Sequence, residues 1–297
     1  MKTKRRNWRP HLTGYLFILP NLLGFLCFTS LPVLASFLLA FTDWNIITPP
    51  EFIGLAHFRH LLEDAQFGWY LWNTAFMMLA IPVSMAASLG LALVMQQKLR
   101  GVVFFRTIFF MPSIVAGVAV YILWVRIYDP SLGLLNQLLN GIGIAGPDWL
   151  GPGWAKPSLM LMGLWASMGG FNMILYLAGL QNIDAELYQA ADIDGAGNWH
   201  KFRHITWPLL APTTFFIFIT SCIGGFQGGF EQAYIMTNGG PFTPYGETTT
   251  LGFYIFKNAY QFLNMGYASA VAWFLFVIVL GVTAINWRYG GRKVEYH

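Results

Sequence analysis

Residues 67–95 read FGWYLWNTAFMMLAIPVSMAASLGLALVM and contain no charged side chain. An uncharged stretch of 18 or more mostly apolar residues is long enough to cross the hydrocarbon core of a bilayer, about 30 Å, as a helix. A Lys, Arg or Asp at the centre of such a helix costs about 2.5 to 3.5 kcal/mol. Five further runs without charge lie at 12–42, 107–125, 158–182, 209–230 and 267–287. The sequence therefore predicts an all-α integral membrane protein with six transmembrane helices.

The composition and the placement of charge support this fold class. Of the 297 residues, 56% are hydrophobic and 10% are charged, whereas about a quarter of residues are charged in a soluble domain. One side of the predicted membrane carries thirteen basic residues: Lys2, Lys4, Arg5, Arg6, Arg9, Lys98, Arg100, Arg106, Lys201, Arg203, Arg288, Arg292 and Lys293. The other side carries four, which are Arg59, Arg126, Lys156 and Lys257. Because Lys and Arg concentrate in cytoplasmic loops, both termini are predicted to be cytoplasmic, and the net charge of +4 does not indicate nucleic-acid binding.

Several other signals are absent or fail in context. The first apolar run is far longer than the core of a signal peptide, so it is expected to remain as a membrane helix. Cys27 and Cys222 fall inside predicted helices and indicate neither a disulfide framework nor a metal site. Residues 141–146 match GxGxxG, but the preceding strand that a dinucleotide site needs is missing. No phosphate-binding loop motif occurs, so we expect no cofactor on this chain.

The loop at 184–208 is the most polar stretch of the second half and reads as two short helices joined by a turn. Asp184 can cap the first helix, and Glu186 in its first turn favours the positive end of the helix dipole. Asp194 and Gly195 are expected to end that helix, because glycine readily adopts the left-handed conformation. We call this segment the hairpin.

The second helix of the hairpin is expected to be capped by Asn198 and to reach its limit at Pro208. Three apolar side chains need burial that so short a segment cannot provide alone: Leu187, Phe202 and Ile205. The hairpin is therefore either a self-contained interfacial element or a docking element for a cytoplasmic partner. His200 and His204 share one helix face, but without further ligands at suitable spacing they do not predict a metal site.

The hairpin resembles the EAA loop of binding-protein-dependent ABC importers, whose pattern is E-A-A, three residues, G, nine residues and I-x-L-P. Gln189 replaces the glutamate of that pattern and Trp207 replaces its leucine. The effect of losing the carboxylate at Gln189 is left open, although an amide still accepts a hydrogen bond. The resemblance implies that an ATPase subunit docks on Glu186, Gln189, Ala190, Ala191, Asp194, Gly195, Ile205 and Pro208.

Shorter motifs along nearly the whole chain resemble the sugar permeases of the maltose, lactose and glycerol-3-phosphate type: YLFILP at 15–20, FIGL at 52–55, WNT at 72–74, FRT at 105–107, TNGGP at 237–241 and GYASA at 266–270. The resemblance implies a type I ABC importer fold in the inner membrane of a bacterial cell. Its expected parts are the N-terminus with the first helix and an outer loop (1–66), a transmembrane domain (67–288) and a cytoplasmic tail (289–297). The implied partners are a second permease subunit, a dimer of ATP-binding subunits that holds ATP and Mg²⁺, and an extracytoplasmic sugar-binding protein.

Polar and small side chains follow the two helices that flank the hairpin. The helix before it carries Trp165, Gly169, Asn172, Tyr176 and Gly179 at intervals of three and four residues, which places them on one face. The helix after it carries Thr213, Thr214, Thr220, Ser221, Gln227 and Gly228. Such faces are expected to avoid lipid. We predict that a sugar pathway is lined by Asn172, Tyr176, Ser221 and Gln227, because aromatic stacking and amide or hydroxyl groups suit a polyhydroxylated ligand. The alternative is that they only hold helices together.

The segment 224–229 contains four glycines. Each interior glycine costs about 1 kcal/mol of helix propensity, so the helix is expected to loosen or break near its outer end. Two interpretations stay open, a packing surface for a partner permease and a gate.

Together these features predict a permease subunit, not an enzyme, of an ATP-driven importer of a sugar or oligosaccharide. Glycerol-3-phosphate or another polyol is the alternative substrate, and the sequence leaves the sugar itself open. An ion-driven transporter usually needs Asp, Glu, Lys or His within the membrane, and the six runs contain none of these. A membrane enzyme would need a catalytic set, but neither HExxH nor GxSxG occurs.

Overall fold

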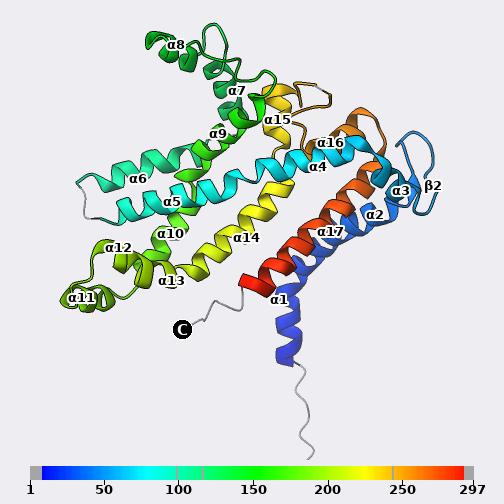
Figure 1. Cartoon of the computed structure of the whole chain (residues 1–297). Coiled ribbons are helices and arrows are strands. Elements are labelled where there is room, and N and C mark those ends of the chain that lie inside the picture. The colour runs from blue at the N-terminus through cyan, green and yellow to red at the C-terminus, as the bar shows by residue number, and fades with distance from the viewer. Residues whose placement is uncertain (1–8, 98–99, 116, 243, 291–297) are drawn as a thin grey trace, which may run out of the picture. The chain divides into compact units, whose positions relative to one another are not determined.

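The computed structural model describes residues 9–97, 100–115, 117–242 and 244–290 (Figure 1). Several residues that carry predictions lie outside these ranges. They are the basic residues within 1–8, Lys98, and most of the tail predicted at 289–297. The chain forms two compact units, one of residues 1–61 with 257–273 and the other of 62–256 with 274–297. We describe each unit separately.

The first unit consists of an N-terminal helical segment, a pair of short strands and the start of the last helix. Its elements are α1 (Arg9–Phe25), a π-helical turn (Leu26–Ser30), α2 (Leu31–Leu39), β1 (Thr42–Asp43), β2 (Glu51–Phe52), most of α3 (Ala56–Glu63), a second π-helical turn (Lys257–Gln261) and the start of α17 (Met265–Gly290). The strands are antiparallel, with Thr42 opposite Phe52. Trp273 donates a hydrogen bond to Ser36 at 3.2 Å, which ties α17 to α2.

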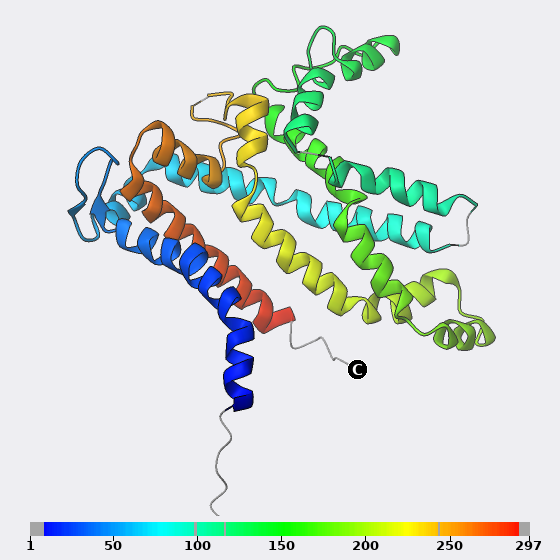
Figure 2. The same ribbon diagram turned by 180° about the vertical axis from the view of Figure 1, so that it is seen from behind.

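The second unit is built from helices and begins with a long pair that runs as one rod (Figure 1 and Figure 2). Its elements are α4 (Ala65–Met77), α5 (Ala80–Gln96), α6 (Val102–Phe110), a 3-10 turn (Met111–Ser113), α7 (Gly117–Ile127), α8 (Leu134–Gly141), α9 (Ala155–Met168), α10 (Phe171–Gln181), α11 (Ala185–Ile193), α12 (Asn198–Lys201), a π-helical turn (Phe202–Thr206), α13 (Trp207–Leu209), α14 (Ala211–Gln227), α15 (Phe230–Thr237), α16 (Leu251–Phe256) and the rest of α17.

The largest core of this unit lies where α5 packs against α10 and α14. Its members are apolar side chains at helical spacing, which explains why the apolar runs fold as helices. They include Met85, Leu89, Ala92, Met173, Tyr176, Leu177, Leu180, Leu210 and Ile217. A second cluster joins α7, α9 and α15 through Val120, Trp124, Tyr128, Leu159, Met162 and Met236.

Among the described residues, four helices are long and apolar enough to cross a membrane: Gly14–Leu39, Ala65–Gln96, Ala155–Gln181 and Met265–Arg288. Two further pairs pass the same test only when taken together, Val102–Ser113 with Gly117–Ile127 and Asn198–Leu209 with Ala211–Gln227. The first pair is bent by 93° and the second by 63°. Four of the predicted runs therefore correspond to spans that pass the test on their own, although Gly169 and Gly170 interrupt Ala155–Gln181. The run 107–125 crosses the bend of the first pair, and the run 209–230 begins at the bend of the second. Each bend lies within four residues of a proline, Pro112 or Pro212, which interrupts helical hydrogen bonding.

Candidate functional site: the hairpin and its pocket

The first helix of the hairpin, α11, has the two ends that the sequence predicts. The carboxylate of Asp184 accepts a hydrogen bond from the Glu186 backbone N–H at 3.0 Å, which caps the helix. At the other end Gly195 has φ +74°. The N–H groups of Gly195 and Ala196 bond back to the carbonyls of Asp192 and Ala191, at 3.1 and 2.8 Å. This pair of bonds is the Schellman motif, which fixes the direction of the chain beyond the helix.

The second half of the hairpin differs from the prediction in two respects. Gly197, and not Asn198, occupies the capping position, because Gly197 is extended and Asn198 is already the first helical residue. The helix ends at Leu209, one residue beyond the predicted limit at Pro208. A π-helical turn precedes α13, so helical structure continues from Asn198 through Pro208 to Leu209. The wider turn accommodates the missing N–H of the proline.

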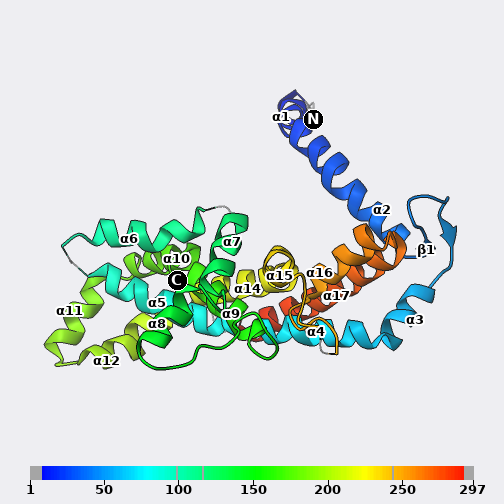
Figure 3. The same cartoon turned by 90° about the horizontal axis from the view of Figure 1, so that it is seen from above.

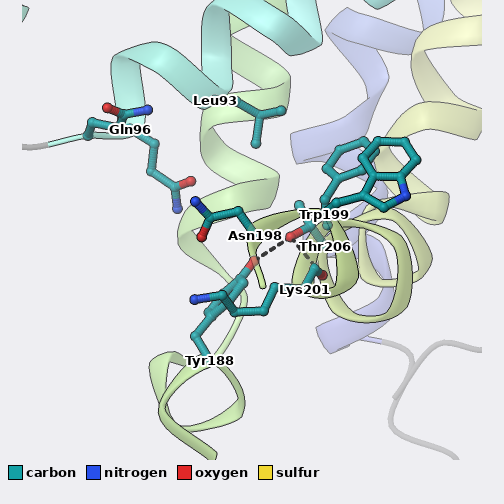
Figure 4. A pocket seen from close by; sticks show the side chains of 9 residues that line it. Leu93, Gln96, Tyr188, Asn198, Trp199, Lys201 and Thr206 are labelled. Carbon is teal, nitrogen blue, oxygen red and sulfur yellow. Dashed lines mark hydrogen bonds between the residues drawn. The ribbon is translucent and has the colours of Figure 1, made fainter. Parts of the chain in front are cut away.

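A pocket of about 850 Å³ lies between the hairpin and the end of α5 (Figure 4). It is lined by Leu93, Gln96 and Gln97 on the α5 side and by Tyr188, Asn198, Trp199, Lys201, Phe202 and Thr206 on the hairpin side. The hydroxyls of Tyr188 and Thr206 share a hydrogen bond of 2.9 Å. Lys201 donates to the carboxylate of Asp192 at 2.7 Å. These two contacts join the two halves of the hairpin into one unit.

The residues predicted for ATPase docking lie mostly on the outside of the hairpin. Glu186, Gln189, Ala190, Asp194, Gly195 and Pro208 are exposed, whereas Ala191 and Ile205 are half-buried. Large apolar side chains are exposed beside them, since Ile193 is 88% and Trp199 is 74% accessible. Exposed apolar groups that cluster with polar ones are typical of surfaces that bind another protein. The docking role of these residues stays a prediction.

The two histidines stack on each other, with ring centroids 4.0 Å apart. His204 Nδ1 is 3.0 Å from the carbonyl of His200. The part of the chain that the structure describes contains no group of three residues that could hold a metal ion.

One of the four predicted pathway residues, Tyr176, lines a cavity that the other three do not line. Tyr176 is 1% exposed and lines a cavity of about 480 Å³ between α5, α10 and α14. Thr214 lies in the same lining, and the hairpin contributes Phe202 and Trp207. The other three candidates do not line this cavity: Asn172 and Ser221 are half-buried, and Gln227 is exposed at the end of α14. Their role in a pathway remains a prediction.

The glycine segment interrupts the helix, as the sequence predicts. Helix α14 ends at Gln227, and Gly229 has φ +83° immediately before α15 begins. A Cβ on Gly225 would come within 3.1 Å of Ile81 and Met78, so this glycine allows close packing within the subunit. Gly224 has open space, which leaves room for a partner at that position. The choice between gate and packing surface remains open.

Asn73 and Thr74 on α4 form a buried polar pair that no pattern in the sequence predicts. Both side chains are almost fully buried and bond to the segment around Thr249, more than 170 residues away. The only signal for them is the WNT motif at 72–74, which contributes to the resemblance to the sugar permeases but indicates no role for either residue.

We expect Tyr188→Phe to weaken the hairpin slightly. Removal of the hydroxyl takes away one partly buried hydrogen bond, worth about 1 kcal/mol. The thermal midpoint of the purified subunit should fall by about 2–4 °C. Tyr15→Phe, at a side chain that is 71% exposed, is the matched control and should leave the midpoint unchanged. An equal midpoint for both variants would show that the Tyr188 bond does not stabilise the fold.

Comparison with known proteins identifies the family. Residues 85–289 match the family described as binding-protein-dependent transport system inner membrane component. The arabinooligosaccharides transport system permease protein AraP of Bacillus subtilis (strain 168) is 34% identical over 97% of this chain and 93% of AraP. The sn-glycerol-3-phosphate transport system permease protein UgpA of Agrobacterium fabrum (strain C58 / ATCC 33970) is 34% identical over 83% of each chain.

Solved structures agree with this result. One is a bacterial ABC transporter involved in the import of the acidic polysaccharide alginate, with a TM-score of 0.87 and 26% identity over 98% of this chain and 99% of that chain. A second structure shows the bacterial alginate ABC transporter in complex with an alginate pentasaccharide-bound periplasmic protein, with a TM-score of 0.86 and 25% identity over 98% of each chain. The chain therefore belongs to the family of inner membrane components of binding-protein-dependent transport systems, the permease subunits of ABC importers.

Proposed function

We propose that this chain is one of two permease subunits of an ATP-driven importer for a sugar or oligosaccharide. It spans the inner membrane of a bacterial cell six times with both termini in the cytoplasm. An extracytoplasmic binding protein delivers the sugar, and a pair of ATPase subunits binds the hairpin of this chain and of its partner permease. ATP and Mg²⁺ are held by the ATPase subunits, and this chain carries no catalytic group.

The observation that supports this proposal best is the construction of the hairpin. Asp184 caps its first helix, and the chain turns at Gly195. The Tyr188–Thr206 hydrogen bond and the Lys201–Asp192 ion pair hold its two halves together. A rigid element can transmit force from a partner, whereas a mobile loop would absorb it. The cavity beside Tyr176 is lined in part by Phe202 and Trp207 of the hairpin, so movement of the hairpin would reach the cavity wall.

The substrate assignment follows from the relatives. AraP and the alginate transporter are named for oligosaccharide or polysaccharide substrates, and UgpA is named for glycerol-3-phosphate. A sugar is the first choice, because the six apolar runs contain no cation that would hold a phosphate. Glycerol-3-phosphate remains the second candidate on the strength of the similarity to UgpA.

Reconstitution tests the proposal. The chain is purified with the second permease and the ATPase and placed in proteoliposomes that contain ATP, and the binding protein is added outside. We expect uptake of at least one neutral oligosaccharide that depends on both ATP and the binding protein. Uptake that needs an ion gradient instead of ATP, or failure of the ATPase to copurify, would refute the importer assignment. Uptake of glycerol-3-phosphate and of no sugar would show that glycerol-3-phosphate, the second candidate, is the substrate.

A further inference from the structure

A half-buried cation on α6 has only part of its hydrogen-bonding capacity satisfied. Helix α6 reads VVFFRTIFF, and Arg106 is its single charged side chain. The guanidinium donates from Nη2 to the Met95 carbonyl at 2.6 Å, but its buried Nε–H has no acceptor among the described residues. Within the same part of the chain Arg106 forms no ion pair. Removal of a charge from water is costly unless the charge is paired, so we expect Arg106 to hold an anion from outside the chain.

The surrounding sequence supplies no anion for this cation. No Asp or Glu occurs between Asp64 and Asp129. The first carboxylate after α10 is that of Asp184, and it is already engaged in capping α11 through the Glu186 N–H. A guanidinium has five N–H donors in a planar fork, which suits the oxygens of a carboxylate or a phosphate.

Arg106 lines an apolar cavity of about 370 Å³ between α6 and α10, two helices that lie side by side in Figure 3. We call this cavity the α6–α10 groove. Its lining consists of Arg106, Thr107, Phe110, Met173, Ile174, Leu177, Ala178 and Gln181. The Thr107 hydroxyl is already bonded to the Val103 carbonyl of its own helix at 3.0 Å. The polar groups that remain for a ligand are therefore the side chains of Arg106 and Gln181.

One end of the groove lies at the membrane surface, on the side of the hairpin. Gln181 is the last residue of the span Ala155–Gln181, and the hairpin starts three residues later at Asp184. From Gln181 back to Met173 the groove follows eight residues of α10, which extend about 12 Å at 1.5 Å per residue. This depth is less than half of the hydrocarbon core of about 30 Å. The groove therefore runs from the surface into one leaflet of the bilayer.

Two hydrogen bonds place Arg106 at the surface end of the groove. Its guanidinium bonds to the Met95 carbonyl, and the adjacent Gln96 donates from Nε2 to the Leu180 carbonyl at 3.4 Å. Gln96 is the last residue of α5, and Leu180 directly precedes Gln181 at the end of α10. The charged group therefore lies beside the ends of both helices, and the rest of the groove is apolar.

This division of polar and apolar groups indicates what kind of ligand fits. A sugar needs several placed hydrogen-bond partners, whereas five of the eight lining residues are apolar. A free phosphate would use the guanidinium and leave the apolar part of the groove unfilled. A phospholipid satisfies both parts, because its phosphate is charged and its acyl chain is apolar. Basic pockets between membrane helices on the cytoplasmic side are typical sites for anionic lipid head groups.

We propose that the α6–α10 groove binds one anionic phospholipid of the cytoplasmic leaflet. Arg106 and Gln181 hold its phosphate, and one acyl chain lies along Phe110, Ile174 and Leu177. The bound lipid links α6 to the end of α10, immediately before the hairpin. The proposed function supplies only the identity of the leaflet, because it places the hairpin in the cytoplasm.

Native mass spectrometry of the purified full-length chain in detergent tests the head-group contact. Phosphatidylglycerol is added stepwise and the bound molecules are counted. We expect Arg106→Gln to raise the half-saturating concentration about tenfold, because hydrogen bonds from a charged donor to the phosphate are lost. Arg106→Lys keeps the charge and should bind more tightly than Arg106→Gln. Phosphatidylcholine, whose head group has no net charge, should bind wild type about tenfold more weakly than phosphatidylglycerol.

Ala178→Phe tests the apolar part of the groove. Ala178 is exposed and lines the groove, so a phenyl ring at this position takes the space of the acyl chain and leaves the guanidinium in place. The half-saturating concentration should again rise about tenfold. This variant also decides the question if Arg106→Gln does not fold. Inorganic phosphate in excess should not displace the lipid, because it gains nothing from the apolar wall.

Arg203→Gln is the matched control. Arg203 is an exposed cation of the hairpin, on the same side of the membrane, and does not line the groove. Its removal should leave the half-saturating concentration unchanged, which separates the groove from the general attraction between basic residues and anionic lipids.

Three results would overturn the inference. The first is a wild-type half-saturating concentration in Arg106→Gln or in Ala178→Phe. The second is full displacement of the lipid by inorganic phosphate, which would make a free anion the ligand. The third is loss of the copurified second permease or ATPase from Arg106→Gln at unchanged lipid binding, because Arg106 would then contact that subunit. Lipid binding is measured without sugar or ATP, so its failure leaves the proposed function untouched.

Discussion

Gly195→Val is expected to reduce ATP-dependent uptake by about tenfold or more while the subunit still inserts into the membrane. Gly195 has φ +74°, in the left-handed region, where an L-residue with a side chain costs about 1–2 kcal/mol per residue. A β-branched residue is worse, so the chain will leave this conformation and break the bonds from Gly195 and Ala196 to α11. The second half of the hairpin then no longer holds its direction, and ATP hydrolysis is uncoupled from transport.

The expected loss of uptake in Gly195→Val comes from backbone conformation and not from a steric clash. A valine at a nearby glycine with an ordinary φ is therefore a matched control. A Cβ on Gly195 would meet no atom within 4 Å, and the same is true of Gly197, two residues along. Gly197 has φ −68° and ψ 164°, an extended conformation that valine adopts readily. Gly197→Val should therefore keep most of the uptake. Uptake and ATP hydrolysis are measured in the same proteoliposomes. Equal loss in both variants, or normal coupling in Gly195→Val, would contradict the role of the turn.

Local signals in the sequence were sufficient for part of the hairpin. The cap at Asp184 and the turn at Gly195 depend on side-chain chemistry and φ within a few residues, and both are confirmed. The second helix was harder, because Gly197 and Asn198 are both acceptable caps and their order does not decide between them. The limit predicted at Pro208 lies one residue before the observed end at Leu209, whereas the π-helical turn Phe202–Thr206 has no signal in the sequence.

Contacts between distant segments were beyond the reach of sequence patterns. Asn73 and Thr249 are 176 residues apart, and their hydrogen bond depends on how α4 and α16 pack. The six apolar runs follow from composition alone, but the bends in two of them depend on local hydrogen bonding at the breaks. The sequence predicts the polar face before the hairpin on one continuous helix. Gly169 and Gly170 separate α9 from α10, which interrupts that face between Trp165 and Asn172.

Gly169→Ala is expected to destabilise the subunit strongly. A Cβ at this position would lie 2.2 Å from the carbonyl oxygen of Phe109, well inside the contact distance of two atoms. The obstacle is backbone and not the end of a flexible side chain, so either α6 or the start of α10 has to move. Overpacking of this kind costs about 1–3 kcal/mol or more. We expect a lower thermal midpoint in detergent and a lower yield of subunit that copurifies with its partners.

Gly163→Ala separates steric conflict from the general effect of adding a methyl group. Gly163 lies in the same span, within α9, and a Cβ there would meet no atom within 4 Å. Alanine is favoured over glycine in a helix by about 1 kcal/mol, so this variant should be as stable as wild type or slightly more stable. The two variants add the same atom six residues apart, so a midpoint that falls in Gly169→Ala and does not fall in Gly163→Ala reports the close approach of Phe109. Equal midpoints would contradict the close approach of the Phe109 carbonyl to Gly169.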